Sequence, residues 1–247
     1  MKVLGIDIGG SGVKGALVDT ESGELLTERH RIDSEHKPSP KEMAKIVKTI
    51  AKHFDWLGPI GVGFPGVIYG SVIKTSANLH EDFCDCDAVK LFSEATGCPV
   101  SLVNDADAAG LAEIRFGAGR DVPGKVLLLT LGTGVGSALF HNGRLCPNME
   151  LGHLPIDGKS AEYFVSSTAR KRRDLSWKKW GKELNGYLQI LEEILWPELI
   201  IIGGGVSAKY EKYFKRLDTR AKLVPAASLN TAGIVGAALW AAEQKSS

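Results

Sequence analysis

The chain has 247 residues, of which 44% are hydrophobic and 24% are charged, and its formal net charge is +1. This composition predicts one or two globular domains with a substantial core, and such a small net charge gives no general attraction to nucleic acid or to a membrane surface. Four cysteines without C-x-x-C spacing, no signal-peptide pattern and no bilayer-length apolar run predict a soluble, cytoplasmic protein without a disulfide framework.

A glycine-rich turn opens the chain. The apolar strand Val3–Ile8 runs into Gly9-Gly10-Ser11-Gly12 and out into a second apolar strand, Val13–Val18. The glycines of Rossmann and P-loop sites open a helix, whereas β-formers follow here, so the turn is predicted to close a hairpin. Its backbone N–H groups suit a phosphate. Asp7 lies inside the first strand, and burying its negative charge is costly unless that charge is compensated by Mg²⁺ held through phosphate or water, or by turn amides. Lys14 either reaches a phosphate or is an exposed strand lysine.

Strands and helices alternate after this hairpin. Apolar spacing and cap signals predict a strand over Leu25–Ile32, a helix over Pro40–Leu57 with Ser39 as N-cap, a strand over Ile60–Phe64, a helix over Asp87–Ala95, a buried strand over Val100–Val103 and a helix over Ala106–Phe116. This alternation indicates an α/β architecture with a partly parallel sheet. Gly117–Gly124 is the candidate hinge between two halves.

The buried strand ends at Asn104-Asp105-Ala106-Asp107. Open α/β sheets place their ligands at such strand ends. Because a sugar hydroxyl is a very weak acid, a kinase positions it beside a carboxylate that accepts its proton during transfer. Asp105 is the candidate base, with Asn104 holding a neighbouring hydroxyl. Helix capping explains the same residue types, and for Asp107 it is the better explanation.

A second glycine hairpin is predicted in the other half of the chain. The apolar strand Val126–Leu131 leads into Gly132-Thr133-Gly134-Val135-Gly136 and then into the strand Ser137–Phe140. Two such turns suggest two related halves that face each other across a phosphate chain, which makes phosphoryl transfer the leading hypothesis.

Glu150-Leu151-Gly152-His153 follows the second hairpin. Metal ligands on one helix face have this spacing, but Gly152 and Pro155 argue against a helix and no cysteine follows to complete a zinc site. A loop that offers one acceptor and one imidazole to sugar hydroxyls fits better. The alternative is a solvated loop histidine.

A basic strip runs from Arg170 to Lys182 around Trp177 and Trp180. Such a strip holds a long polyanion by counterion release, or it is simply a solvated helix face. Tryptophan among lysines also suits single-stranded nucleic acid, but nothing else in the chain supports that partner.

A helix over Lys182–Leu195 and an apolar strand over Leu199–Ile202 lead into Gly203-Gly204-Gly205, after which more helix is expected. These glycines allow a nucleoside to approach the backbone closely, or they form a plain turn between a strand and a helix.

Several segments resemble the ROK family of sugar kinases: GIDIGGSGVKGALVD, NDADAAGLAE, LLTLGTGVGSA, the ELGH box and NTAGIVGAA. Three others, GPIGVGFPGV, HNGRLCPNMELGHL and TSAN, resemble a subgroup that uses inorganic polyphosphate. The resemblance implies an actin-like (ribonuclease H-like) α/β fold of two subdomains with glucose in the cleft between them. Residues 1–116 would form the first, with a helix over 231–247 packing back on it, and residues 117–230 the second.

The resemblance also implies a glucokinase reaction, in which the 6-hydroxyl of glucose receives a phosphoryl group from polyphosphate or ATP with Mg²⁺, in a homodimer. Carried over by position, Asp105 is the base and binds glucose with Asn104, Glu150, His153 and Glu162. Phosphates are assigned to Asp7, Gly9, Gly10, Ser11, Gly12 and Lys14 and to Gly132, Thr133 and Gly134, the nucleoside to Gly203, Gly204 and Gly205, and the polyphosphate path to Arg172, Arg173, Lys178 and Lys179.

One departure from the family pattern concerns zinc. Most ROK kinases follow the Glu-x-Gly-His box with zinc-binding cysteines, whereas Leu154–Ala169 contains none, so no zinc is expected. Two alternatives stay open: a strictly ATP-dependent hexose or amino-sugar kinase, and a non-catalytic sugar-sensing protein. Repressors of that second kind carry an N-terminal DNA-binding helical domain, whereas this sequence opens directly with its first strand.

Overall fold

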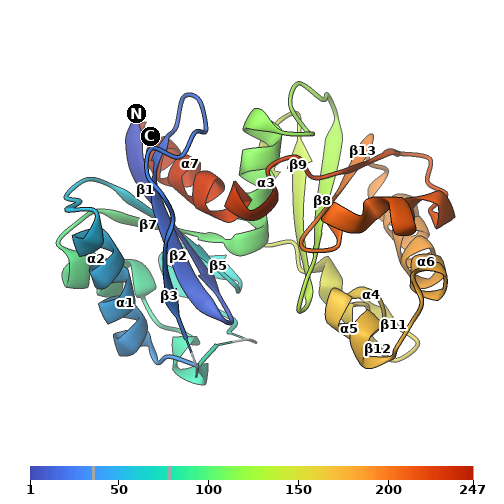
Figure 1. The fold of residues 1–247 in the computed structure, drawn as a ribbon, viewed down its shortest axis with the longest axis horizontal. Helices are drawn as coiled ribbons and strands as arrows, with labels where there is room; N and C mark the ends of the chain where they lie inside the picture. Colours follow the sequence, from blue (N-terminus) through green and yellow to red (C-terminus); the bar gives the residue numbers. More distant parts are fainter. Residues whose placement is uncertain (35–36, 77–78, 247) are drawn as a thin grey trace. The chain divides into compact units, whose positions relative to one another are not determined.

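A computed structural model describes residues 1–34, 37–76 and 79–246, and the chain in it divides into two compact units (Figure 1). Unit 1 comprises Met1–Ala112 with Thr231–Ser247, and unit 2 comprises Glu113–Asn230. The division falls slightly before the expected boundary at residue 116. Glu113 accounts for this, because its buried carboxylate accepts hydrogen bonds from the backbone N–H groups of Ala118, Ala227 and Ser228, all in unit 2.

Unit 1 is built on a five-stranded sheet in the order β3-β2-β1-β4-β7. The strands are β1 (Lys2–Gly9), β2 (Gly12–Asp19), β3 (His30–Asp33), β4 (Ile60–Phe64) and β7 (Val100–Asn104). β2 pairs antiparallel with both β1 and β3, while β4 pairs parallel with β1 and β7. The predicted hairpin is confirmed. The predicted strand over Leu25–Ile32 is wrong in its first part, where only Leu25 forms a single bridge with Val18.

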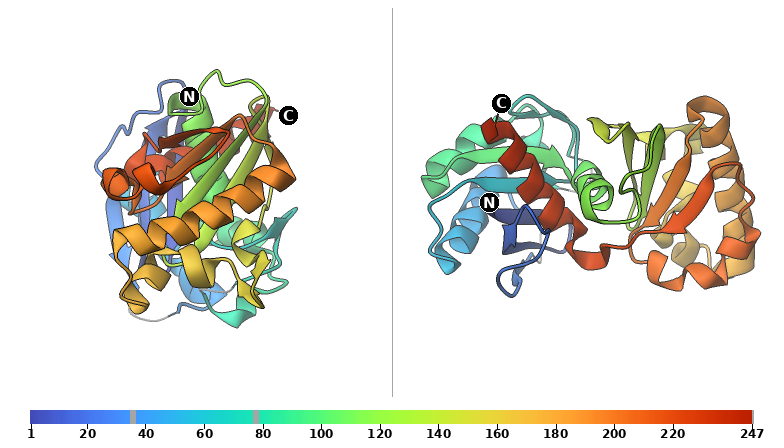
Figure 2. Two further views of the ribbon diagram at one scale, coloured as in Figure 1. Left: turned by 90° about the vertical axis from the view of Figure 1, so that its right-hand side faces the viewer. Right: turned by 90° about the horizontal axis from the view of Figure 1, so that it is seen from above.

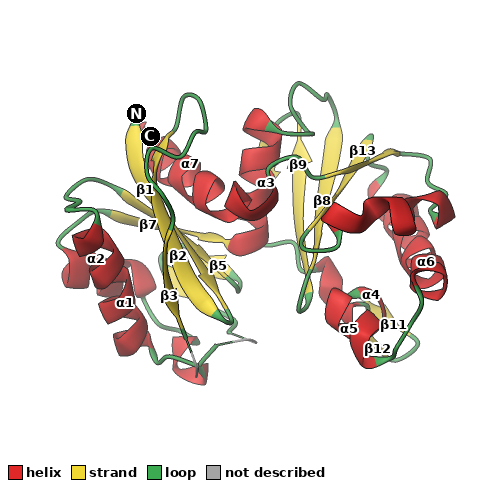
Figure 3. Cartoon of the chain, in the orientation of Figure 1, coloured by secondary structure: helices red, strands yellow, loops and turns green. Residues whose placement is uncertain are grey.

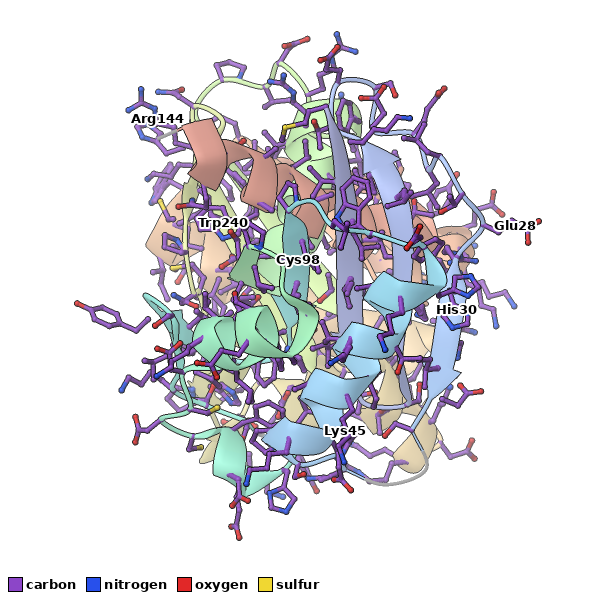
Figure 4. All side chains as sticks on the ribbon, turned by 90° about the vertical axis from the view of Figure 1, so that its left-hand side faces the viewer. Glu28, His30, Lys45, Cys98, Arg144 and Trp240 are labelled. Carbon is purple, nitrogen blue, oxygen red and sulfur yellow. The ribbon has the colours of Figure 1, made fainter. Side chains whose placement is uncertain are left out.

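Helices cover both faces of this sheet (Figure 3). On one face lie α1 (Pro40–His53) and α2 (Ala88–Thr96), and Figure 4 looks onto that layer, with His30 on the outer strand β3. On the other face lies α7 (Ala232–Ser246), so close to β1 and β4 that a Cβ on Gly5 or Gly61 would overlap its backbone. The smaller elements of unit 1 are β5 (Ile68–Tyr69), β6 (Val72–Ile73) and η1 (Glu81–Phe83).

Helix α1 begins as predicted and ends early. Ser39 forms a capping box with Glu42, which satisfies two N–H groups at the helix start. The helix ends at His53 rather than Leu57, because Phe54 leaves helical geometry and Asp55 adopts a left-handed φ of 47°.

Unit 2 repeats the strand order of unit 1. Its sheet runs β10-β9-β8-β13-β14, with β8 (Lys125–Leu131), β9 (Val135–His141), β10 (Arg144–Cys146), β13 (Leu199–Gly203) and β14 (Lys222–Pro225). β9 is antiparallel to β8 and β10, while β13 is parallel to β8 and β14. The second predicted hairpin is therefore confirmed, and two related halves are present.

One long helix, α6 (Trp177–Leu195), covers the unit 2 sheet (Figure 2, left). It begins earlier than predicted, because Ser176 caps it by accepting from the Lys179 N–H. Short elements complete the unit: η2 (Leu151–His153), β11 (Pro155–Ile156), β12 (Lys159–Ser160), α4 (Glu162–Val165), α5 (Ser167–Arg172), η3 (Ser207–Lys212), η4 (Phe214–Arg216) and η5 (Leu229–Thr231), the last of which enters unit 1. The expected helix after Gly205 is replaced by 3₁₀ turns. None of the helices in the described ranges is long and apolar enough to cross a membrane.

Candidate active site

In the first glycine turn, one position requires glycine for steric reasons and another has empty space beside it. Gly9 and Gly12 pair across the hairpin, so Gly10 and Ser11 form its tip. Gly12 has a φ of 153°, and a Cβ there would stand 2.7 Å from the Ile32 carbonyl oxygen. Gly10 has no neighbouring atom within 4 Å of the place a Cβ would take. The tip therefore leaves open space beside its backbone, as phosphate binding requires.

Three charged side chains form a row across the sheet beside this turn. Asp7 is the direct partner of Lys14 on β2, and Lys14 is the direct partner of Arg31 on β3, so the three share one face. The Arg31 guanidinium donates to the Ser11 carbonyl oxygen at 3.3 Å and to an Asp33 carboxylate oxygen at 2.5 Å. Arg31 was missed in the sequence, because only the strand register shows that it adjoins the turn.

The carboxyl group of Asp7 packs against the first turn of α7. Its Oδ1 lies 3.0 Å from the place that a Cβ on Gly233 would take. Burial raises the pKa of Asp7, and the charge of Lys14 opposes that rise. A helix N-terminus favours a negative charge.

The residues around the first turn fit magnesium carried on phosphates. Mg²⁺ prefers hard oxygen ligands and takes only one or two protein carboxylates when it is bound with substrate phosphates. Asp7 provides one such carboxylate next to the open turn. In the described part of the chain, no group of three or more His, Cys, Asp or Glu side chains is arranged so that it could hold a metal ion.

Asn104 is the helix cap at the end of β7. It is 7% exposed, and its Oδ1 accepts from the N–H groups of Ala106 at 2.8 Å and Asp107 at 3.1 Å, while its Nδ2 donates to the Gly66 carbonyl at 3.1 Å. The capping role considered for Asp105 therefore belongs to Asn104. With its acceptor doubly used, the second hydrogen of Nδ2 is what this amide can offer a sugar hydroxyl.

Asp105 is the half-buried first residue of α3 (Asp105–Phe116). Its Cα lies 3.8 Å from the place that a Cβ on Gly63 would take, and Gly63 is the strand partner of Asp7. Both carboxylates therefore lie at the same end of the sheet, where the parallel strands terminate. One Asp105 oxygen accepts from the Ala106 N–H at 2.8 Å. Asp107, only 1% exposed, lies in the same helical turn, and its own N–H is one of the two that Asn104 caps, so the cap expected at Asp107 is at Asn104.

A carboxylate sits on the second glycine turn. The turn Gly132–Gly134 joins Leu131 to Val135, and its Gly132 carbonyl accepts from the Thr168 N–H at 3.2 Å. Glu162 Oε2 accepts from the Val135 N–H at 3.3 Å and lies 2.5 Å from the place of a Cβ on Gly134. Glu162 is thereby attached to the loop assigned to phosphates.

Glu150 and His153 lie side by side near the same loop. Their Oε2 and Nε2 atoms are 3.3 Å apart, with exposed side-chain fractions of 36% and 55%. The segment forms one 3₁₀ turn instead of the expected loop, and Gly152 packs directly on the Val135 carbonyl. Burial raises the pKa of Glu150, the His153 imidazole lowers it and the Glu162 carboxylate raises it further. Unit 2 thus brings Glu150, His153 and Glu162 together.

The three glycines after β13 differ from one another. Gly204 has a φ of 78°, and a Cβ there would stand 2.7 Å from the Leu131 carbonyl oxygen, so the fold itself requires glycine at this position. Gly205 is exposed with open space beside it, whereas Gly203 is buried in the strand. Close approach of a nucleoside to these glycines stays a prediction, and Gly205 is the most accessible of the three.

The structure separates the basic strip into inward and outward members. The Arg170 guanidinium lies 4.1 Å from the Trp177 ring centroid and donates to the Leu175 carbonyl, and Arg173 makes two hydrogen bonds with the Glu183 carboxylate, at 2.6 and 2.9 Å. Arg172, Lys178 and Lys179 are exposed. The tryptophans belong to the core: Trp180 is fully buried and donates to the Val165 carbonyl, and Trp177 stacks on Tyr213.

These features define a class of protein: a two-unit α/β fold with a glycine hairpin at the edge of each sheet and carboxylates beside it. The ROK family model matches residues 3–171. The polyphosphate glucokinase of Mycobacterium tuberculosis is 45% identical over 237 residues, which cover 96% of this chain and 89% of that protein. The chain belongs to the ROK family.

Solved structures extend the likeness to three dimensions. The inorganic polyphosphate/ATP-glucomannokinase of Arthrobacter sp. strain KM matches with a TM-score of 0.94 and 44% identity, covering 98% of this chain and 99% of that one. A ROK family glucokinase from Streptomyces griseus, solved with glucose and AMPPNP, matches with a TM-score of 0.81 at 22% identity and covers 98% and 100% of the two chains. The second match shows the shared fold.

Proposed function

We propose that this protein is a glucokinase that transfers a phosphoryl group from inorganic polyphosphate or ATP to the 6-hydroxyl of glucose. The observation that carries the proposal is the 45% identity to a polyphosphate glucokinase over 96% of the chain. The match to the polyphosphate/ATP-glucomannokinase at a TM-score of 0.94 supports both donors.

In the proposed reaction, Asp105 is the general base. Its carboxylate accepts the proton as the O6–H bond breaks, O6 forms a bond to the terminal phosphorus of the donor, and the bond between that phosphorus and the rest of the donor breaks. ADP or a polyphosphate shortened by one unit leaves. The capping by Asn104 supports this role, because Asp105 is not needed to accept the helix N–H groups that Asn104 accepts.

Glucose is bound, in this proposal, by Asn104, Asp105, Glu150, His153 and Glu162. Asn104 offers an N–H donor, Glu150 an acceptor and His153 an imidazole, so sugar hydroxyls would meet both kinds of partner. The 3.3 Å contact between Glu150 and His153 orients each of them before sugar arrives.

Donor phosphates are assigned to the two hairpins, with Gly9–Gly12 and Lys14 on one and Gly132–Gly134 on the other. When bound with the donor through Asp7, Mg²⁺ neutralises charge that develops on the transferred phosphoryl group. The nucleoside of ATP is assigned to Gly203–Gly205. Lys178 and Lys179 with Arg172 remain the candidate path for a longer phosphate chain, while Arg173 would first have to leave Glu183.

The test is a coupled assay with glucose, Mg²⁺ and each donor separately, on wild type and Asp105→Asn. We expect turnover of the variant to fall roughly 10²–10⁴-fold with both donors, as for a positioned general base, while glucose binding stays nearly intact. Asp121→Asn, an exposed aspartate in a loop, serves as the charge-matched control. More than about a tenth of wild-type turnover in Asp105→Asn contradicts the assignment, and turnover with ATP alone favours the strictly ATP-dependent alternative.

Three finer proposals accompany this function. We propose a homodimer, which size-exclusion chromatography with light scattering tests. A cytoplasmic location is supported by the unpaired state of all four cysteines, since reducing compartments keep thiols unpaired. We also propose that the pure protein carries no stoichiometric zinc, and one tightly held zinc per chain in metal analysis contradicts this.

A further inference from the structure

A tight hairpin fixes Lys159 beside an aromatic ring in unit 2. β11 and β12 are joined by Asp157 and Gly158, whose φ values of 47° and 75° are those of a type I′ turn. Lys159 follows this turn directly, and its Nζ lies 3.9 Å from the centroid of the Tyr163 ring. At this distance a cation is attracted to the face of the ring.

A second cation approaches the same ring. The Arg172 guanidinium carbon lies 4.5 Å from the Tyr163 ring centroid, and its NH2 group donates to the Tyr163 carbonyl at 3.2 Å. Tyr163 is 37% exposed, and both cations are exposed. Across the described ranges, neither Lys159 nor Arg172 has a carboxylate within ion-pair distance.

The surroundings of Tyr163 are strongly positive. The pKa of its phenol is lowered first by a hydrogen bond from Lys159, then by the charge of Lys159 and, more weakly, by those of Arg172 and Arg173. Because Arg173 is already neutralised by Glu183, the positive charge available to a ligand is that of Lys159 and Arg172.

Short segments of chain connect these two cations to residues that are bonded to the second glycine turn. Glu162, next to Tyr163 in the chain, bonds to the N–H of Val135. Thr168 donates its N–H to Gly132, and Arg172 follows one helical turn later, about 6 Å along α5. Residues four apart share a helix face, so Arg172 continues the side of α5 that begins at the loop. Figure 1 shows α4, α5, β11 and β12 gathered at one end of unit 2.

We propose that Lys159 and Arg172, both held against the Tyr163 ring, form a clamp for a linear chain of condensed phosphates that extends from the Gly132–Gly134 turn. This clamp rests on the proposed function and adds a residue, Lys159, that the basic strip of the sequence did not contain. Two cations near one ring repel each other, and a polyanion bound to both removes that repulsion. Because the ring and the turn already hold both side chains, little rotamer freedom is lost on binding.

The test compares Lys159→Gln, Arg172→Gln and the double variant with Lys222→Gln. Lys222 is an exposed lysine on β14 and serves as a control away from the clamp. Its N–H donates to the Glu198 carbonyl, just beyond the C-terminal end of α6. The clamp is at the other end of that helix, where Trp180 donates to the Val165 carbonyl of α4. The measurements are kcat/KM with long-chain polyphosphate and with ATP across a salt series, and equilibrium binding of long-chain polyphosphate without glucose. Thermal melting confirms that each variant is folded, and Arg172→Lys keeps the charge.

Each single variant should lower kcat/KM for long polyphosphate roughly fivefold at low salt and the double variant more, with a salt slope smaller by about one per lost cation. Turnover with ATP should stay within about twofold, and Arg172→Lys should recover part of the loss. If the wild type turns over polyphosphate and the folded double variant binds and uses it like Lys222→Gln, the clamp is wrong while the proposed function stands. If the wild type binds polyphosphate without turning it over and the double variant loses that binding, the clamp stands and the proposed donor is wrong.

Discussion

The two glycine hairpins occupy matching places in sheets of the same strand order, yet the charges around them differ. Beside the first turn lie the cations Lys14 and Arg31, with the Asp7 carboxyl drawn back against α7. On the second turn lies the Glu162 carboxylate, which already accepts a hydrogen bond from the loop backbone.

This difference indicates that two turns with the same fold need not have the same role in binding. A phosphate at the first turn meets backbone donors and positive side chains together. At the second turn, Glu162 would repel a phosphate close to Val135, and the clamp proposed above supplies the cations for a long anion from Lys159 and Arg172. We therefore expect the first turn to hold the reacting end of the donor.

Asp7→Asn should produce the largest effect and sharpen the comparison at the first turn. We expect turnover to fall about 10–100-fold, as when a residue that orients a metal is lost. Folding should respond in the opposite direction. Burial raises the folded-state pKa of Asp7, so stability falls as the pH rises from the unfolded-state pKa to that raised pKa and stays lower above it, and the amide removes this cost.

Thermal melting across a pH series checks the stability part of this prediction. The variant should melt a few degrees above the wild type at neutral pH, and the difference should shrink as the pH falls and Asp7 becomes protonated in both states. A lower melting temperature at neutral pH would mean that the ionised carboxylate stabilises the fold.

Gly134→Ala and Gly10→Ala compare the turns directly. A Cβ on Gly134 must displace Glu162, whereas a Cβ on Gly10 meets no atom within 4 Å. We expect Gly134→Ala to lower kcat/KM roughly tenfold and to destabilise unit 2 by about 1 kcal/mol. Gly10→Ala should leave the melting temperature unchanged, so that any loss of its activity reports phosphate approach alone. Equal melting temperatures for both variants would contradict the close contact at Glu162.

Glu162→Gln tests the negative charge at the second turn through the pKa of Glu150. The Glu162 charge helps to raise that pKa, so its removal should move the acid limb of the pH profile of kcat/KM to lower pH. His153→Gln removes a group that lowers the same pKa and should move the limb to higher pH. Shifts in the same direction for both variants would contradict these electrostatic roles, whatever their absolute rates.

Arg31→Met should have the smallest effect. Its guanidinium is already engaged by Asp33 and Ser11, so the remaining attraction for a phosphate is modest. We expect kcat/KM to fall a fewfold with either donor and the salt dependence to become slightly shallower. If Lys222→Gln, measured in parallel, lowers kcat/KM by the same factor, Arg31 contributes only through the general surface charge of the protein.

Local chemistry predicted most of the fold. Gly-Gly-Ser-Gly between apolar strands specified a hairpin, Ser39-Pro40 specified a helix start, and short apolar runs located β4 and β7 within a residue. Predictions failed where a turn residue ended an element early, as Asp55 does after α1, or where a cap extended it, as Ser176 does before α6. Each such failure depends on a backbone angle or a single hydrogen bond that residue type alone does not decide.

The candidate site was predicted by residue type, but its partners were not. The sequence by itself determined that Asn104 and Asp105 end a buried strand and that glycine turns precede the second strand of each half, because these patterns depend on neighbours along the chain. Only the three-dimensional structure decided that Asn104 is the cap, that Arg173 is neutralised by Glu183, that Lys159 lies against the Tyr163 ring and that Arg31 adjoins the first turn. Arg31 reaches the turn through strand register, in which a shift of one residue would turn its side chain to the opposite face, and the other contacts depend on the path of the backbone between residues near each other in the chain.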